Sequence, residues 1–138
     1  MKITVYGTPA PQGSKRHVGN GVLIESSKKV KPWRQDVKHA ALAVRGDDPP
    51  IDGPVLLRIV FTLPKPKSAP KRIRTYADKK PDIDKLLRST LDALTESGII
   101  ADDARVIEFD RLAKVFPNED AEALDVPGAV ITITRVTA

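Results

Sequence analysis

The chain has 138 residues, a length that accommodates one domain with a single hydrophobic core. It contains no cysteine, which excludes disulfides, cysteine-ligated metals and a thiol nucleophile, and it has no apolar run long enough for a membrane span. Lys and Arg outnumber Asp and Glu by 23 to 18, and the net charge of +5 predicts a polyanionic partner for a cytoplasmic protein without membrane contact.

The first quarter of the chain predicts a strand followed by a hairpin. Residues 2–8 alternate between apolar and polar side chains, which is typical of a half-buried strand. Prolines and a glycine then interrupt regular structure. The Gly-Asn-Gly sequence at 19–21 is typical of a tight turn, so we expect residues 22–24 to form a short return strand.

A helix is predicted from a cap at Ser26 or Ser27 to Arg45. Its apolar residues recur at helical spacing and fall on one face, and Pro32 fits only the first turn. Trp33 lies on the apolar face. We therefore expect it to pack in the core or in a dimer interface rather than to stack on a DNA base.

The middle of the chain predicts a buried strand followed by a mobile basic loop. Residues 55–63 are rich in β-branched and apolar side chains, which is typical of a central strand. Residues 64–80 contain three prolines and seven basic residues against one acidic residue. Such a segment is expected to be mobile and to become ordered on DNA, where its cations contact phosphates.

The second half of the chain predicts a helix and two strands. Leu and Ile recur at helical spacing between Pro81 and Gly98, and glycine is typical of the position after a helix end. Strands are predicted at 105–115 and 130–136, with an acidic loop at 117–128 between them. All 138 residues thus predict one α+β domain, in which two helices pack on a small mixed sheet.

Two pairs of carboxylates flank the second predicted helix. Asp82 and Asp84 are separated by one residue where the chain is still extended, so their side chains point the same way. Asp102 and Asp103 follow the helix, and hard oxygen ligands suit Mg²⁺ or Mn²⁺. A helix of about fourteen residues spans roughly 20 Å, so the pairs meet only if the next strand returns past the first turn or a dimer partner contributes. The alternative is that these aspartates are helix caps and turn residues.

The segment from Lys79 to Val106, KKPDIDKLLRSTLDALTESGIIADDARV, resembles the signature of RusA-type Holliday-junction resolvases. That signature has an Asp-x-Asp-Asn-Leu opening, a helix with Leu-Asp-Ala-Leu, and Asp-Asp before a strand. The opening strand with Gly7, Pro9, Gly13 and Lys15 is also similar to the N-terminal pattern of the family.

The resemblance implies a homodimeric, Mg²⁺-dependent endonuclease that cuts four-way DNA junctions by paired nicks. By position, Asp82, Asp84 and Asp103 match the essential metal-binding carboxylates of the family. Asp102 matches the adjacent acidic position, which we include among the candidate metal ligands.

Two positions depart from the family pattern. Lys85 stands where the family usually has Asn, and Arg88 stands where it has a functional Lys. Arg keeps the charge, so Arg88 is a candidate catalytic residue in a phosphate-contacting or electrostatic role rather than in proton transfer. Contacts to the DNA backbone are expected from ten cations: Lys15, Arg16, Lys65, Lys67, Lys71, Arg72, Arg74, Lys79, Lys80 and Lys85.

Two other functions fit the same residues. A non-catalytic DNA-binding protein would use the aspartates only as caps and turns, and would bind DNA in a salt-dependent way without nicking it. A nuclease of the same chemistry would instead prefer flaps, forks or replication intermediates.

Overall fold

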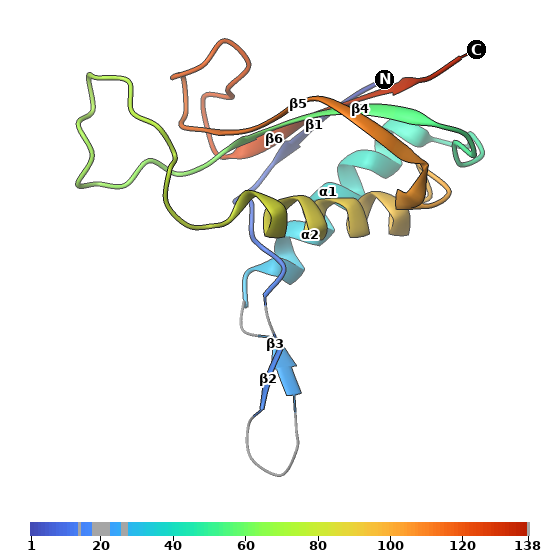
Figure 1. The fold of residues 1–138 in the computed structure, drawn as a ribbon, viewed down its shortest axis with the longest axis horizontal. Coiled ribbons are helices and arrows are strands. Elements are labelled where there is room, and N and C mark those ends of the chain that lie inside the picture. Colours follow the sequence, from blue (N-terminus) through green and yellow to red (C-terminus); the bar gives the residue numbers. More distant parts are fainter. Residues whose placement is uncertain (14, 18–22, 26–27, 138) are drawn as a thin grey trace.

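The computed structural model describes residues 1–13, 15–17, 23–25 and 28–137, which form a four-stranded sheet, a separate two-stranded ribbon and two helices (Figure 1). In chain order the elements are β1 (Lys2–Tyr6), β2 (Lys15–His17), β3 (Leu23–Glu25), α1 (Val30–Arg45), β4 (Val55–Thr62), α2 (Ile83–Ser97), the short 3₁₀ helix η1 (Asp103–Arg105), β5 (Val106–Val115) and β6 (Gly128–Arg135). The predicted order of elements and the α+β class are confirmed.

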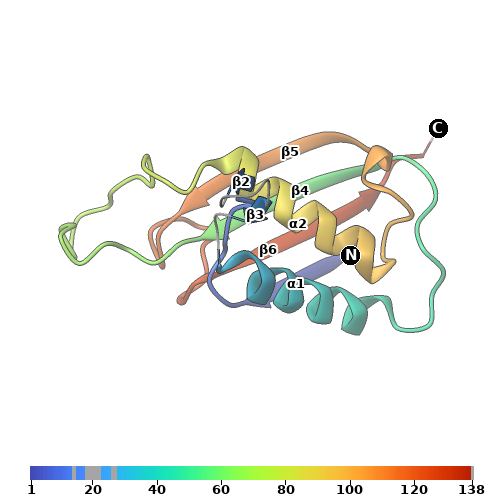
Figure 2. The same cartoon turned by 90° about the horizontal axis from the view of Figure 1, so that it is seen from below.

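The four-stranded sheet is mixed, with the strand order β1-β6-β4-β5. Strand β6 pairs antiparallel with β1 and β4, whereas β4 and β5 are parallel and therefore need a crossover connection. Helix α2 lies in that crossover, beginning near the carboxyl end of β4 and ending near the start of β5 (Figure 1). Both helices cover the same face of the sheet (Figure 2). Within the described ranges, no helix is long and apolar enough to cross a membrane.

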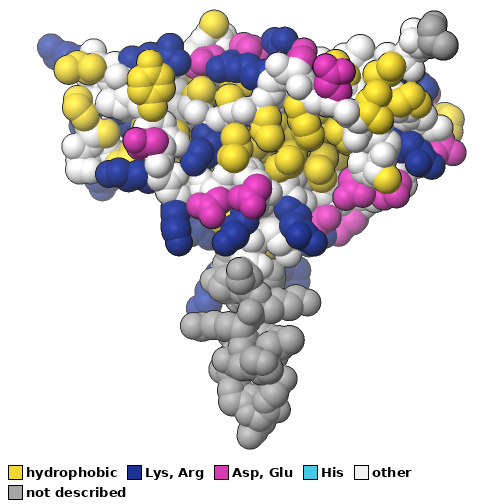
Figure 3. Space-filling model, viewed as in Figure 1, with side chains coloured by type: hydrophobic (Ala, Val, Ile, Leu, Met, Phe, Trp, Pro, Cys, Tyr) yellow, Lys and Arg dark blue, Asp and Glu magenta, His cyan; other side chains and the backbone are white. Residues whose placement is uncertain are grey.

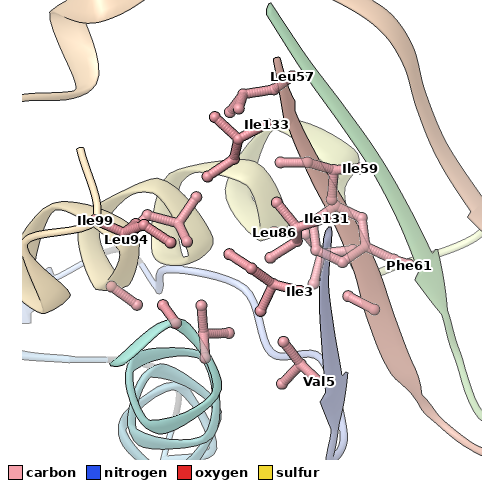
Figure 4. Packing of buried hydrophobic residues seen from close by; sticks show 14 of the residues in the cluster. Ile3, Val5, Leu57, Ile59, Phe61, Leu86, Leu94, Ile99, Ile131 and Ile133 are labelled. Atoms are coloured by element: carbon pink, nitrogen blue, oxygen red, sulfur yellow. The ribbon is translucent and has the colours of Figure 1, made fainter. Parts of the chain in front are cut away.

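The core lies between this face of the sheet and the two helices (Figure 4). On β4, Leu57, Ile59 and Phe61 are fully buried, and from α2 they meet the fully buried Leu86 and Leu94. Because strand side chains alternate, the residues between the first three point to the opposite face. Burial of branched aliphatic side chains on one face thus explains why the aromatic-poor sequence still forms a core.

A buried hydrogen bond joins the two helices. Helix α1 begins at Val30, later than a cap at Ser26 or Ser27 would place its start, and it holds Pro32 in its first turn, where proline was expected. The Trp33 side chain is only 1% exposed, and its Nε1 donates a 3.1 Å hydrogen bond to Thr90 Oγ1 on α2. Trp33 is therefore a core residue of the protomer and is not available to stack on DNA.

Two local predictions lie outside the described residues: the cap at Ser26 or Ser27 and the tight turn at 19–21. The structure places Lys29 at the N-cap position of α1, with no side-chain cap hydrogen bond. The return strand β3 covers Leu23–Glu25, close to its predicted position.

The segment that follows β1 is fastened to the first turns of α2. Ser89 Oγ donates a 2.7 Å hydrogen bond to the carbonyl of Ala10, and the Gln12 N–H donates to the carbonyl of Lys85 at 3.0 Å. Ala10 is buried. This segment consequently forms a fixed wall beside the start of α2.

Paired charges occupy the face of the sheet that the helices leave uncovered. Arg58 on β4 pairs with Asp110 at 2.9 Å and with Glu122 at 3.0 Å. On the neighbouring strand β5, Arg111 binds both carboxylate oxygens of Asp120 at 2.8 and 2.9 Å. The guanidinium of Arg111, followed by the backbone N–H of Glu122, holds the pKa of the Asp120 carboxyl well below its usual range. These pairs anchor the loop between β5 and β6 to the sheet.

We expect Asp120→Asn to lower the free energy of unfolding at pH 7 by about 2 kcal/mol, because a nearly buried charge-assisted pair is lost. The pKa of Asp120 is depressed in the folded protein, so its contribution is complete above the ordinary carboxyl pKa near 4 and is lost as the pH falls toward the folded value. Urea unfolding of both proteins at pH 7 and pH 3 measures this gap.

The exposed Asp125 of the same loop provides the matched control, since Asp125→Asn removes an equal charge from the surface. Its unfolding free energy should match the wild type at both pH values. An Asp120→Asn protein whose deficit is the same at pH 3 as at pH 7 would contradict the assigned role of the carboxylate.

Candidate active site

Asp82 and Asp84 lie at the start of α2 with exposed side chains. Asp82 occupies the N-cap position in an extended backbone conformation, and Asp84 belongs to the first turn. The Asp82 side chain makes no cap hydrogen bond, and its Oδ2 lies 3.9 Å from Lys85 Nζ. The carboxylates are therefore free of the capping role that the sequence left open, and they face solvent beside a cation.

The segment that leads into α2 is held by Lys114 near the end of β5. Lys114 Nζ donates hydrogen bonds to the carbonyl of Lys79 at 2.8 Å and to the carbonyl of Pro81 at 2.9 Å. Both carbonyls belong to the three residues that precede Asp82. Lys114 was not among the predicted site residues, because it lies 33 to 35 positions from its partners and no local pattern marks it.

Asp102 and Asp103 lie beyond the C-terminal end of α2, at the start of η1. Neither side chain caps this short helix. A hydrogen bond between the two carboxyl groups raises the pKa of Asp103 above its usual range, and loss of hydration and the negative charges of Asp102 and Asp92 act in the same direction. Two carboxylates held this close create a local negative potential, and a bound cation would reduce the repulsion between them.

The two acidic pairs lie at opposite ends of α2 in a single protomer (Figure 1; Figure 2). At 1.5 Å per residue, the 15 residues of α2 span about 22 Å. The described residues, which include all four aspartates, contain no group of three acidic or histidine side chains that could hold one metal ion. Within one protomer, Asp103 therefore does not join Asp82 and Asp84.

Arg88 lies one helical turn after Asp84, on the same side of α2, and its side chain is exposed. A guanidinium at this position is available to a phosphate that approaches the first turn. Lys79 and Lys80, which precede Asp82 in the chain, are also exposed. The start of α2 thus combines two carboxylates with several cations.

The basic loop, residues 64–80, is attached to the loop between β5 and β6. Glu119 accepts hydrogen bonds from Lys65 Nζ at 2.5 Å and from the Thr75 N–H at 2.7 Å, and Lys65 also reaches the carbonyl of Ile73. Arg74 pairs with Asp120 at 3.3 Å. The sequence suggested neither acidic partner, although the opposite net charges of the two loops are a signal that could have done so.

The predicted DNA-binding cations differ in availability. Lys65 is largely buried in its ion pair, with 15% of its side chain exposed, whereas Lys67, Lys71 and Arg72 are exposed. Lys15 and Arg16 belong to β2, whose backbone pairs with β3, but their side chains lie outside the described part of the chain.

An apolar patch extends between α2 and β5 (Figure 3). Its members pack against the core with one side and are only partly buried: Leu87, Leu91, Val106, Phe109 and Leu112. We call this surface the α2–β5 patch. It runs along the helix that carries one acidic pair at each end.

A comparison with protein families matches residues 6–133 to the family described as Endodeoxyribonuclease RusA. The match covers nearly the whole chain and leaves out most of β1, of which only Tyr6 is included, and the last two residues of β6. No curated protein matches the chain.

Proposed function

Because the chain belongs to the RusA endodeoxyribonuclease family, we propose that it is a homodimeric, Mg²⁺-dependent nuclease of the cytoplasm that resolves four-way DNA junctions by paired symmetric nicks in recombination and repair. Its chemistry would be hydrolysis of DNA phosphodiesters. The observation that carries the proposal is that neither aspartate pair makes a helix-capping hydrogen bond. Both pairs match the acidic positions of the family by resemblance, and they lie beside exposed cations.

The donor set fits a hard divalent cation. The candidate ligands are carboxylates, the chain has no cysteine, and Asp102 and Asp103 already face each other closely enough to raise the pKa of Asp103. When bound, such a cation lowers the pKa of a water molecule and neutralises charge that develops on the phosphate. We assign its binding to Asp82, Asp84, Asp102 and Asp103, with Mn²⁺ as an alternative ion.

A second copy of the chain would complete this ligand set. Two protomers that join through the α2–β5 patch hold their α2 helices antiparallel if the twofold axis is perpendicular to α2 and passes beside its middle. In that dimer, Asp82 and Asp84 of one protomer approach Asp102 and Asp103 of its partner. The arrangement covers the apolar patch and produces two equivalent sites, which suits paired cuts in strands of a four-way junction.

The remaining residues of the site would orient the DNA. Arg88, one helical turn after Asp84, would contact the phosphate beside that carboxylate. The exposed cations of the basic loop, together with Lys79 and Lys80, would track the backbone without reading sequence. Lys114 would keep Asp82 in position through its hydrogen bonds to the preceding carbonyls.

Cleavage of a synthetic four-way junction tests the proposal directly. We expect symmetric nicks near the branch point with Mg²⁺, none with EDTA, and little cutting of linear duplex. A three-way junction and a flap, run in parallel, separate a junction resolvase from a nuclease that prefers other branched DNA. Salt-dependent binding without Mg²⁺-dependent nicking of any substrate would contradict the proposal and identify a non-catalytic DNA-binding protein.

A further inference from the structure

A pocket of about 550 Å³ lies immediately before the start of α2. The lining includes the segment Thr8–Pro11, which is fastened to α2 through Ala10, and two stretches of the basic loop. Phe116, the residue after β5, also lines the pocket, and the lining residue Pro81 directly precedes Asp82. The volume lies within the range of small-molecule sites in proteins.

The pocket offers flat apolar faces together with cations. Several prolines, Tyr76 and Phe116 line it, and Tyr76 keeps 71% of its surface exposed at the rim. The guanidinium of Arg74 lies 5.1 Å from the centre of the Tyr76 ring and restrains it. Lys29, Lys79 and Lys80 outnumber Asp78 among the charged residues of the lining. This combination suits a planar aromatic ligand that carries phosphates.

From this geometry, and resting on the proposed junction-cleaving function, we propose that the pocket binds one nucleobase that leaves its base pair at the branch point of the DNA. The base stacks against Tyr76 and the prolines, while its flanking phosphates contact Lys79 and Lys80. The DNA strand that carries this base then leaves the pocket past Pro81, next to Asp82. A base beside a branch point is not enclosed in a continuous duplex, so it costs less to extrude than a base within linear DNA, and the pocket would select branched DNA over linear duplex.

A matched pair of loop variants tests the pocket. Ala69 lines it, whereas the 65%-exposed side chain of Ile73, on the same loop, does not. In an Asp82→Asn background, Ala69→Phe fills the pocket and should weaken junction binding about tenfold, the size of one base–aromatic stack. Ile73→Phe adds the same ring outside the pocket and should bind like its parent.

Abasic junctions identify the bound nucleotide. Each nucleotide beside the crossover is replaced in turn by an abasic residue, and binding is measured by gel shift. At one position, the abasic substitution should weaken binding by the parent protein about tenfold. The same substitution should not weaken binding by Ala69→Phe any further, because both changes remove the same contact. Tyr76→Ala should behave like Ala69→Phe, and Tyr76→Phe like the parent, which guards against a loop that simply misfolds.

Two outcomes overturn the pocket assignment. In the first, Ala69→Phe and Ile73→Phe bind junctions equally well. In the second, the loss of affinity from the abasic residue and the loss from Ala69→Phe are independent at every position, so that the two factors multiply. These outcomes are distinct from failure of the proposed function. If the wild type cuts junctions but no abasic position matters, only the pocket assignment fails. If an abasic position couples to Ala69 but the wild type cuts nothing with Mg²⁺, only the nuclease assignment fails.

Discussion

Asp82→Asn is expected to reduce Mg²⁺-dependent junction cleavage about a thousandfold or more while leaving junction binding intact or stronger. The substitution preserves the size of the side chain and removes a charge that binds a cation and repels phosphate. Asp82 is exposed and caps nothing, so the fold should not change. Single-turnover cleavage measures the loss of activity, and a gel shift in EDTA measures binding.

The exposed Asp47, just beyond the end of α1, supplies the control, because Asp47→Asn changes the net charge equally at a residue that is not among the candidate ligands. It should cleave like the wild type. An Asp82→Asn protein that cuts at the wild-type rate with Mg²⁺ would remove Asp82 from the site. A protein that loses binding and cleavage together would indicate that Asp82 supports DNA contact rather than hydrolysis.

Mixing Asp82→Asn with Asp103→Asn protomers is expected to restore activity that neither variant has alone. If each site takes Asp82 from one protomer and Asp103 from the other, a mixed dimer has one doubly altered site and one intact site. Equal mixing makes half of the dimers mixed, so about a quarter of the wild-type number of sites is recovered. Single-turnover nicking of a junction after co-refolding of the two variants provides the measurement.

The form of the recovered activity adds a second criterion. Mixed dimers should nick one strand and leave the junction unresolved, since only one of their two sites is intact. A mixture of Asp82→Asn with Asp84→Asn should recover nothing, because both changes affect the same half of every site. No recovery in either mixture, with dimers present, would mean that the carboxylates of one protomer act without those of its partner.

Much of the fold could be predicted because local patterns determine it. The spacing of apolar residues marked α2, and Gly98 adopts the left-handed conformation, φ 76°, that ends it. The apolar run from Val55 became the central strand β4, as expected for residues buried beneath helices. The strand predicted from Arg105 begins one residue later, because Asp103–Arg105 form η1.

The candidate site was predictable as a set of residues but not as an arrangement. Spacing and family resemblance selected the four aspartates, yet the parallel pairing of β4 with β5, which keeps the two pairs at opposite ends of α2, depends on contacts distant in sequence. Lys114 and Glu119 act through partners 33 to 54 positions away, which periodicity does not reveal. The mobility of the basic loop without DNA, and its ordering on DNA, stay predictions.

The hydrogen bonds that Lys114 donates to the carbonyls of Lys79 and Pro81 have an energetic consequence for the proposed reaction. The strand that carries it belongs to the parallel pair of the sheet, so the rigidity of the sheet extends to the backbone that bears Asp82. The loss of conformational entropy that orders this turn therefore occurs when the chain folds and not when DNA binds. In the proposed nuclease, a carboxylate that is already in position would leave more of the DNA-binding energy for distorting the junction.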